Sequence, residues 1–385
     1  IGHLYPKVEV TEEMAADRPD LAPYVGQQLT VIAWLWARTV PSPDPAMAGA
    51  HVPLIASYWL CKKPGKLTWI EPKVDKFNQT WRFDVRTGTS PPHELVDRGT
   101  KVGRGDFACL LSGAAMSASS IRECARDGLV KYRLVGIVAD SGQGRVYLSA
   151  TASQEQYANS QTPVNAPTTD LPSHALGFRV QNYGYTTHAS LYTSRQLAVL
   201  DTLTSMVASV RERIEQDIHA AYSQQNAAGV SAPSGGYSYA DAVSLMLGIA
   251  VSRRHDRWSA FSIWHTIREN LESMIRLSAV PMTWEFAEGN PFSDSTGNFL
   301  DGVLLTAKAI EGLGWGRPGR AEQCDARHVP RDGSSIISTD PPYFDNVPYA
   351  DLSDLFYVWL RKALHPVVPD LMRTILVPKE AELVA

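Results

Sequence analysis

Four residues near the end of the chain, Asp340-Pro341-Pro342-Tyr343, carry its clearest chemical signal. They follow a short apolar run, residues 335–339, which is typical of a buried strand that ends at a loop. Because each proline fixes its own φ angle and restricts the residue before it, the loop would hold the Asp340 carboxylate and the Tyr343 ring in a fixed relation. The carboxylate and the Pro341 carbonyl can accept hydrogen bonds from an exocyclic amine, while the ring stacks on an extruded base. This arrangement suits alkylation of a nucleobase amine.

The residues after this loop predict a pocket wall and a helix. Asp345 and Asn346 are close enough in sequence to line a base pocket, or they could simply shape the loop. A helix is expected over residues 351–364. Its apolar residues share one face, which indicates core packing more than a base-binding surface. They are Leu352, Leu355, Phe356, Trp359 and Leu360.

Composition bounds the protein class. The 385 residues, 44% of them apolar, suffice for two or three domains with real cores. A net charge of −4 means that any phosphate-binding face must be local. Four scattered cysteines argue against a disulfide framework and suit a reducing cytoplasm. No run of apolar residues is long enough to span a membrane, and no signal peptide is visible, so we expect a cytoplasmic protein.

The elements expected along the chain fall into groups. Residues 1–28 are irregular, residues 29–150 are β-rich, and residues 151–185 form a polar connector. The strand-like runs are 29–37, 54–60, 67–70, 80–85, 133–139 and 145–148, with a hairpin signal at 140–144 between the last two. Residues 186–300 read as a helical region, and residues 301–385 as a further unit.

Capping and spacing predict the helices. Thr193 and Gln196 form a capping box ahead of leucines and valines at helical spacing. Further helices are expected at 239–253, 264–277 and 303–313, and an elaborate loop at 284–300. Ile1 stands in place of a methionine, and the chain ends in a helical-looking run, so we expect a piece of a longer protein.

Two basic clusters could contact nucleic acid. Arg253 and Arg254 lie in a short basic stretch with Trp258, which could contact phosphates or a displaced base. Alternatively, they are the charged C-terminus of a helix, where arginine favours the helix dipole. Lys62 and Lys63, with Lys66, form a second basic spot.

These motifs resemble a known family. The tetrapeptide at 340–343 resembles motif IV of the S-adenosylmethionine-dependent amino-methyltransferases. The longer string from Asp340 to Leu360 resembles the signature of large prokaryotic adenine-specific DNA methylases, which carry a zinc ribbon and an N-terminal domain of unknown function. Other segments that look like this family are residues 1–6, 31–39, 182–184, 192–197 and 290–292.

The resemblance implies a fold, an activity and a cofactor. The fold would be α/β, a partial Rossmann-like S-adenosylmethionine-dependent methyltransferase with a β-rich insert and a helical region. Residues 1–28 would link to a missing upstream cofactor-motif region, residues 29–150 would be a degenerate zinc-ribbon-like insert, and residues 301–385 the methyltransferase core. The activity would be methyl transfer from S-adenosylmethionine to the N6 amine of adenine in DNA. Family context suggests restriction-modification or phage defence, with other defence-system proteins as partners.

The resemblance also assigns roles to residues. The catalytic residues would be Asp340, Pro341, Pro342 and Tyr343. Asp325, which could otherwise be a surface turn residue, would bind the cofactor's adenine together with Asp340. The substrate would be held by Tyr343, Asp345, Asn346, Arg253 and Arg254.

The chain departs from the family pattern in two places, and these departures affect the expected cofactor site and the expected zinc site. No credible glycine-rich cofactor loop after a strand is present, since Gly312-Leu-Gly-Trp-Gly316 follows a helix instead. The family's cysteine pairs become Ser42 and Met47 in one turn and Cys109 and Ser112 in the other. One cysteine cannot hold zinc tetrahedrally, so we predict a metal-free descendant of the ribbon.

Alternatives remain open. N4-cytosine transfer requires the same hydrogen-bond acceptors as N6-adenine transfer, and RNA or protein substrates are less expected. Because the glycine-rich loop is missing, the chain could instead be a catalytically inactive module that binds DNA.

Overall fold

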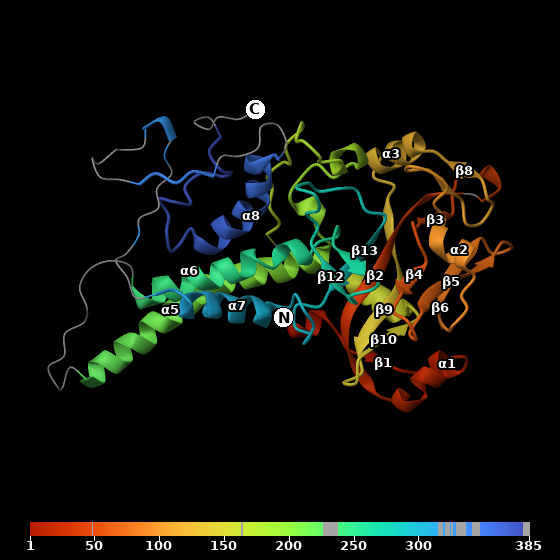
Figure 1. The fold of residues 1–385 in the computed structure, drawn as a ribbon, viewed down its shortest axis with the longest axis horizontal. Coiled ribbons are helices and arrows are strands. Elements are labelled where there is room, and N and C mark those ends of the chain that lie inside the picture. Colours follow the sequence, from red (N-terminus) through yellow and green to blue (C-terminus); the bar gives the residue numbers. More distant parts are fainter. Residues whose placement is uncertain are drawn as a thin grey trace.

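The fold was determined as a computed structural model. It describes residues 1–47, 49–162, 165–225, 238–314, 319, 324, 326–328, 336–340 and 347–379. The molecule is elongated, with a β-rich half at one end and a layer of long helices at the other (Figure 1).

Strand β2 (Gln28–Pro41) organises the β-rich half. Its aromatic and β-branched residues are buried almost without interruption from Val31 to Val40, so both faces of the strand are covered. Strand β9 runs along one edge of β2, and three short strands share the other edge. The partners in this antiparallel sheet are β1 (Val8–Glu9), β3 (His51–Leu54), β9 (Lys131–Asp140), β10 (Arg145–Leu148) and β13 (Glu285–Gly289).

Smaller antiparallel sheets surround this one. The three-stranded sheet contains β4 (Trp59–Cys61), β5 (Thr68–Asp75) and β6 (Thr80–Thr87). The two hairpins are β7 (Phe107–Ala108) with β8 (Ala115–Met116), and β11 (Ile263–His265) with β12 (Asn270–Glu272). The hairpin predicted around residues 140–144 is confirmed, because Arg145 of β10 pairs with Asp140 of β9. The run at 54–60 divides between β3 and β4 instead of forming one strand.

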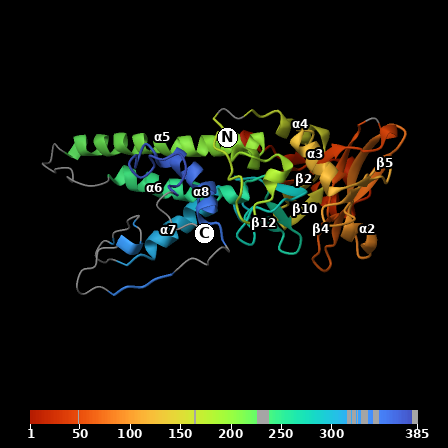
Figure 2. The same cartoon turned by 90° about the horizontal axis from the view of Figure 1, so that it is seen from above.

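Four helices build the other half and stack side by side (Figure 2). They are α5 (Ser194–Gln225), α6 (Tyr239–Ser252), α7 (Phe299–Glu311) and α8 (Tyr349–Leu364). Helix α6 packs against the other three. Its contact with α8 is close because position 248 is glycine, where a Cβ atom would lie 2.6 Å from a methyl group of Leu364.

Short helices lie on the β-rich half and in the segments that connect the strands and the long helices. The α-helices are α1 (Glu12–Ala15), α2 (His93–Arg98), α3 (Ala118–Arg126) and α4 (Ala152–Asn159). The 3-10 helices are η1 (Gly2–Leu4), η2 (Pro19–Tyr24), η3 (Pro45–Met47), η4 (Val180–Tyr183), η5 (Ala189–Leu191), η7 (His255–Arg257) and η8 (Ala326–His328).

The capping box at the start of α5 is confirmed. The Thr193 amide donates to Gln196 Oε1 at 2.8 Å, and the Gln196 amide donates to Thr193 Oγ1 at 3.2 Å. The helices predicted at 239–253, 303–313 and 351–364 also form, as α6, α7 and α8, each within a few residues of the expected bounds.

Two expectations for residues 264–300 are wrong. Residues 264–277 form the β11–β12 hairpin and a turn instead of a helix, because Glu269, Leu277 and Ser278 have left-handed φ angles of 52°, 49° and 58°. The loop expected at 284–300 contains β13, which pairs with residues 33–37 of β2.

The described residues combine helices with antiparallel sheets, which agrees with the expectation of a mixed fold. Every strand pair in the described residues is antiparallel, so a Rossmann-like methyltransferase sheet is not among them. Residues 336–340 were expected to end a buried strand. They form no strand, and Ile336 is 99% exposed, because no strand within the described ranges pairs with them. No helix in the described part of the chain is long and apolar enough to cross a membrane.

Candidate functional site

Asp340 is the one member of the predicted catalytic tetrapeptide that the structure describes. Its side chain is exposed, on the segment that precedes α8. The other predicted residues of this site lie outside the described residues: Asp325, Pro341, Pro342, Tyr343, Asp345 and Asn346. No described contact joins Asp340 to Arg253 or Arg254. Asp340 is therefore open to a partner molecule, and its assigned role stays a prediction.

The helix that follows the tetrapeptide is positioned by core packing, as predicted from its apolar face. Leu355 and Trp359 of α8 are each 1% exposed. The Trp359 indole N–H donates to the Tyr192 hydroxyl at 3.1 Å, just before α5. Sequence patterning gave no sign of Asp354, which is 2% exposed and accepts hydrogen bonds from the Val377 amide and from Lys379. This contact fixes the segment after α8 against the helix.

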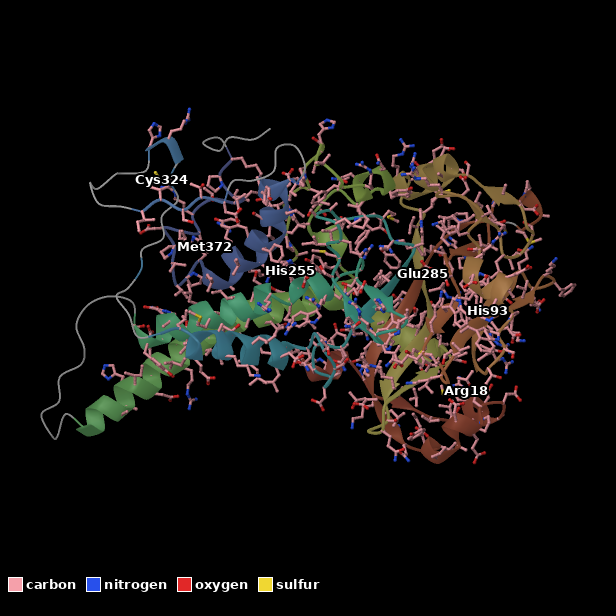
Figure 3. All side chains as sticks on the ribbon, viewed as in Figure 1. Arg18, His93, His255, Glu285, Cys324 and Met372 are labelled. Atoms are coloured by element: carbon pink, nitrogen blue, oxygen red, sulfur yellow. The ribbon has the colours of Figure 1, made fainter. Side chains whose placement is uncertain are left out.

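The two predicted DNA-binding arginines differ in exposure. Arg253 is exposed at the end of α6, whereas Arg254 is 5% exposed and packs against Gly302 of α7. Burial lowers the pKa of Arg254, the charges of Arg257 and Arg253 lower it further, and Asp301 opposes this. His255, the next residue, lies where the helical and β-rich halves meet (Figure 3). Arg253 is the better placed of the two for contact with a large partner.

The second basic spot is neutralised by acidic partners. Lys63 and Lys66 both pair with Glu269, at 2.6 and 2.9 Å, and Lys62 pairs with Asp97 at 3.7 Å. Burial opposes ionisation of Glu269, but the two lysines and the Tyr147 hydroxyl outweigh it and lower the pKa of Glu269 to about 2. These lysines clamp the β11–β12 hairpin onto the loop between β4 and β5, which disfavours a role in binding phosphate.

Four of the segments that resemble the methylase family converge where the two halves meet. They contribute Tyr5 from residues 1–6, Trp34 from 31–39, Arg195 from 192–197 and Phe292 from 290–292. The Arg195 guanidinium carbon lies 4.2 Å from the centre of the Trp34 ring and 4.7 Å from that of Tyr5. The Tyr5 and Phe292 ring centres are 6.0 Å apart. We call this group, together with Thr193, Gln196 and Glu288, the junction cluster.

A buried ion pair lies at the centre of the junction cluster. Arg195 Nε donates to Glu288 Oε1 at 2.8 Å, and the two side chains are 0% and 1% exposed. Thr193 Oγ1 donates to the same carboxylate oxygen at 3.0 Å, and Arg195 Nη1 donates to the Leu4 carbonyl. Burial opposes the charge on Arg195, but Glu288 outweighs this effect and raises the pKa of Arg195.

Four polar atoms of the junction cluster lack hydrogen-bond partners. They are the Tyr5 hydroxyl, Arg195 Nη2, Gln196 Nε2 and Glu288 Oε2, all buried. Burial and the Glu288 charge raise the pKa of Tyr5, so its hydroxyl stays protonated. A bound water that bridges donors to Glu288 Oε2 would satisfy such groups. Sequence reasoning missed Glu288 because it assigned the residue to a loop, and it treated Arg195 only as part of a helix start.

The two turns expected to derive from a zinc ribbon meet in space. Ser42 Oγ lies 3.2 Å from Cys109 Sγ, and Met47 packs partly buried against the core. Burial opposes ionisation of Cys109, but hydrogen bonds from Ser112 and Ser42 outweigh it and lower the pKa of the thiol. No group of three or more histidine, cysteine or acidic side chains in the described part of the chain could hold a metal ion. That the module folds without metal stays a prediction.

Comparisons with protein-family models, with curated proteins and with solved structures return no match for this chain. The family resemblance therefore rests on the quoted motifs alone.

Proposed function

We propose that this chain is part of a DNA methyltransferase that acts on the N6 amine of adenine. The observation that carries the proposal is the sequence Asp340-Pro341-Pro342-Tyr343, with an exposed Asp340 carboxylate, ahead of the packed helix α8. A carboxylate that must accept a hydrogen bond from a substrate amine has to be reachable, and Asp340 is. The meeting of the Ser42 and Cys109 turns supports the same family.

The chain's own residues would position and polarise the amine. Asp340 and the Pro341 carbonyl would accept hydrogen bonds from its two hydrogens, which keeps the nitrogen lone pair available for alkylation. Tyr343 would stack on the flipped base and hold its plane. Catalysis would then be positioning and electrostatics, with no covalent enzyme intermediate.

S-adenosylmethionine is the methyl donor that the proposal requires. The described residues contain no glycine-rich turn from a strand into a helix that could hold its methionine end. They do not fit this cofactor by themselves. In this proposal the protein works in the cytoplasm, with DNA as its partner and other proteins of a defence system beside it.

An inactive DNA-binding module is the second candidate function. The absence of parallel strand pairs and of a glycine-rich turn within the described ranges favours it. N4-cytosine transfer is the alternative within the enzyme class, because a cytosine amine needs the same two acceptors.

The test measures methylated nucleosides in host DNA by mass spectrometry. It compares expression of this chain with the same chain extended upstream in its native reading frame, each as wild type and as Asp340→Ala. We expect N6-methyladenine above background from the extended form and none from its Asp340→Ala variant. An Asp17→Ala change, at another exposed aspartate, is the matched control and should retain methylation.

The other outcomes decide between the candidates. N4-methylcytosine in place of N6-methyladenine would change the assigned base. An unmodified genome from both forms, with DNA binding retained, would support the inactive module. Methylation that persists in Asp340→Ala would refute the role given to this residue.

A further inference from the structure

Arg254 is a buried cation that is only partly compensated in the described structure, by the charges of Asp301 and Asp256. It is 5% exposed, and its Nε atom is buried with no hydrogen-bond partner. The guanidinium arm lies against the first turn of α7, where a Cβ at Gly302 would come within 3.0 Å of its Cγ and 3.2 Å of its Nε. No carboxylate among the described residues forms an ion pair with it. A buried charge is costly unless it is paired, so this residue calls for an anion.

The neighbours of Arg254 add to the charge. Arg253 precedes it on the surface, and Arg257, one turn later, has a side chain that is 32% exposed. Arg257 has a loose contact with Asp256, at 3.3 Å. Asp301 is the nearby carboxylate on α7, and it accepts a hydrogen bond from the Gly297 amide. We call Arg253, Arg254 and Arg257 the arginine corner.

The helix dipole does not account for the arginine corner. Positive charge at the C-terminus of α6 is favourable when side chains reach the last carbonyl groups. The Arg254 side chain donates no hydrogen bond to these carbonyls in the described structure. The dipole therefore favours a cation at this end of α6, but no carbonyl among the described residues replaces the hydrogen bonds that the Arg254 guanidinium loses on burial.

We propose that the arginine corner binds a backbone phosphate of duplex DNA. This inference rests on the proposed function, because it takes DNA as the partner, but it assigns the contact to a specific surface. A phosphate would complete the coordination of Arg254 and could replace Asp256 on Arg257. Arg145 of β10 reaches the same loop before α7 from the other half: it donates to Ser295 Oγ at 3.2 Å, two residues from Gly297, against which Arg257 packs.

The contact is to phosphate and not to a base. Trp258, the aromatic residue of the basic stretch, is 1% exposed, and its indole N–H donates to the Gly297 carbonyl at 3.0 Å. It is therefore not available as a stacking platform. Phosphate contacts carry no sequence information, so the arginine corner would supply affinity on any duplex.

Fluorescence anisotropy with a labelled duplex of mixed sequence, over a series of salt concentrations, tests the inference on the full chain. Arg253→Ala removes an exposed side chain, so folding is not at risk. We expect roughly fivefold weaker binding and a slope of log affinity against log salt that falls by about one. Arg253→Glu should weaken binding further. Arg82→Ala, which removes an arginine whose side chain is 75% exposed on β6, and Lys63→Ala should both leave the slope unchanged.

Arg254, the buried residue of the arginine corner, needs a substitution that still allows the protein to fold. Arg254→Met removes the guanidinium but keeps an unbranched apolar stem, and its thermal melting shows whether the fold survives. If it folds, it should lower the salt slope as Arg253→Ala does. Wild-type affinity and slope in the Arg253 variants would overturn the arginine corner while leaving DNA binding in place. Absence of duplex binding by the wild-type chain would overturn both the corner and the DNA-binding part of the proposed function.

Discussion

Four arginines among the described residues are buried, and three of them have a carboxylate or carbonyl partner within the fold. Arg18 pairs with Asp20 and donates to the carbonyls of Val85 and Tyr147. Arg38 is 0% exposed and has no carboxylate partner in the described structure, but it donates to the Tyr185 hydroxyl and to the carbonyls of Thr283 and Ala260. Arg195 instead pairs with Glu288, and Arg254 has neither solution. Because Arg254 alone among these four forms neither an ion pair nor a hydrogen bond to a carbonyl in the described part of the chain, it is the one that fits a partner from outside.

The Arg195–Glu288 pair should be expensive to break from one side. Glu288→Gln leaves the guanidinium buried and uncompensated, so we expect the free energy of unfolding to fall by about 3–5 kcal/mol. Urea denaturation followed by circular dichroism measures this change. The double variant Arg195→Met/Glu288→Leu removes both charges and should recover most of the loss.

An exposed pair is the matched control for this prediction. The side chains of Arg213 and Asp217 are 74% and 63% exposed and 3.0 Å apart. Arg213→Ala should change the free energy of unfolding by less than about 0.5 kcal/mol. Equal small effects at both pairs would show that the junction cluster is not held by its ion pair.

Glu269 predicts a specific acid dependence of stability. Its pKa is about 2 in the folded protein, against an ordinary value of 4.5. A carboxylate with a lowered folded pKa stabilises the protein fully above its unfolded pKa, and this stabilisation is lost as the pH falls through the folded value. The wild-type free energy of unfolding should therefore fall more steeply than that of Glu269→Gln between about pH 5 and pH 2.5.

The control for the acid prediction is an exposed carboxylate. Asp370 is exposed and has no ion pair in the described structure. Asp370→Asn should leave the pH dependence as steep as in the wild type. A Glu269→Gln variant with the wild-type slope would mean that the lysine clamp contributes nothing to acid stability.

At the scale of elements, the sequence predicts those helix starts and turns that are formed by residues close together in the chain. Thr193 and Gln196 cap α5 through their own backbone and side chains, and the turn at 140–144 closes the β9–β10 hairpin. These features depend on residues a few positions apart. Their patterns are therefore readable without knowing the rest of the fold.

The features that sequence reasoning missed depend on distant partners. Strand β13 exists because residues 33–37 of β2 lie beside it, and a five-residue run gives no sign of that pairing. The hairpin at 263–272 has the apolar spacing of a helix, but left-handed Glu269 and its two lysines favour the turn. The same limit applies to the candidate site. Arg253 and Arg254 are identical in type and adjacent in sequence, and only the folded structure shows that the first is exposed and the second buried.

The contact between the turns that contain Ser42 and Cys109 predicts that a metal site can be built there. A tetrahedral zinc site with bonds of about 2.3 Å places its sulfur atoms roughly 3.8 Å apart, close to the 3.2 Å between Ser42 Oγ and Cys109 Sγ. The variant Ser42→Cys/Met47→Cys/Ser112→Cys should therefore bind one zinc ion per chain. Elemental analysis of the purified protein and the visible spectrum of its cobalt form measure this.

The zinc site built in this way has a strict control. Adding Cys109→Ser to the triple variant removes the fourth thiolate and should abolish tight binding. A folded triple variant that takes up no zinc would show that the turns do not have the arrangement of a zinc ribbon. That result would weaken the family resemblance, but it would not affect the proposal that the arginine corner binds phosphate.

At the scale of the whole molecule, the two halves are tied together through β2. Strand β13 reaches the sheet from the part of the chain that carries the helices, and Trp36 of β2 stacks on Phe286 of β13, with ring centres 6.2 Å apart. Arg38, also on β2, takes its acceptors from residues 185, 260 and 283. The β-rich half therefore completes its core only with residues from beyond its own sequence boundary.

This dependence predicts that residues 29–150 do not fold alone, although their composition marks them as a separate module. The isolated fragment would expose the β13 edge of β2 and would lose the acceptors of Arg38 together with most of the rings that cover it, which a marginally stable core cannot tolerate. We expect no cooperative thermal transition from this fragment and a single one from the full chain, by circular dichroism and by tryptophan fluorescence. Mixing the fragment with a second one that spans residues 151–379 should restore the transition, because that piece supplies β13 and the acceptors of Arg38. A cooperative transition and a dispersed amide spectrum from residues 29–150 alone would instead show that β2 is stable without β13, and that the two halves are independent units which only touch.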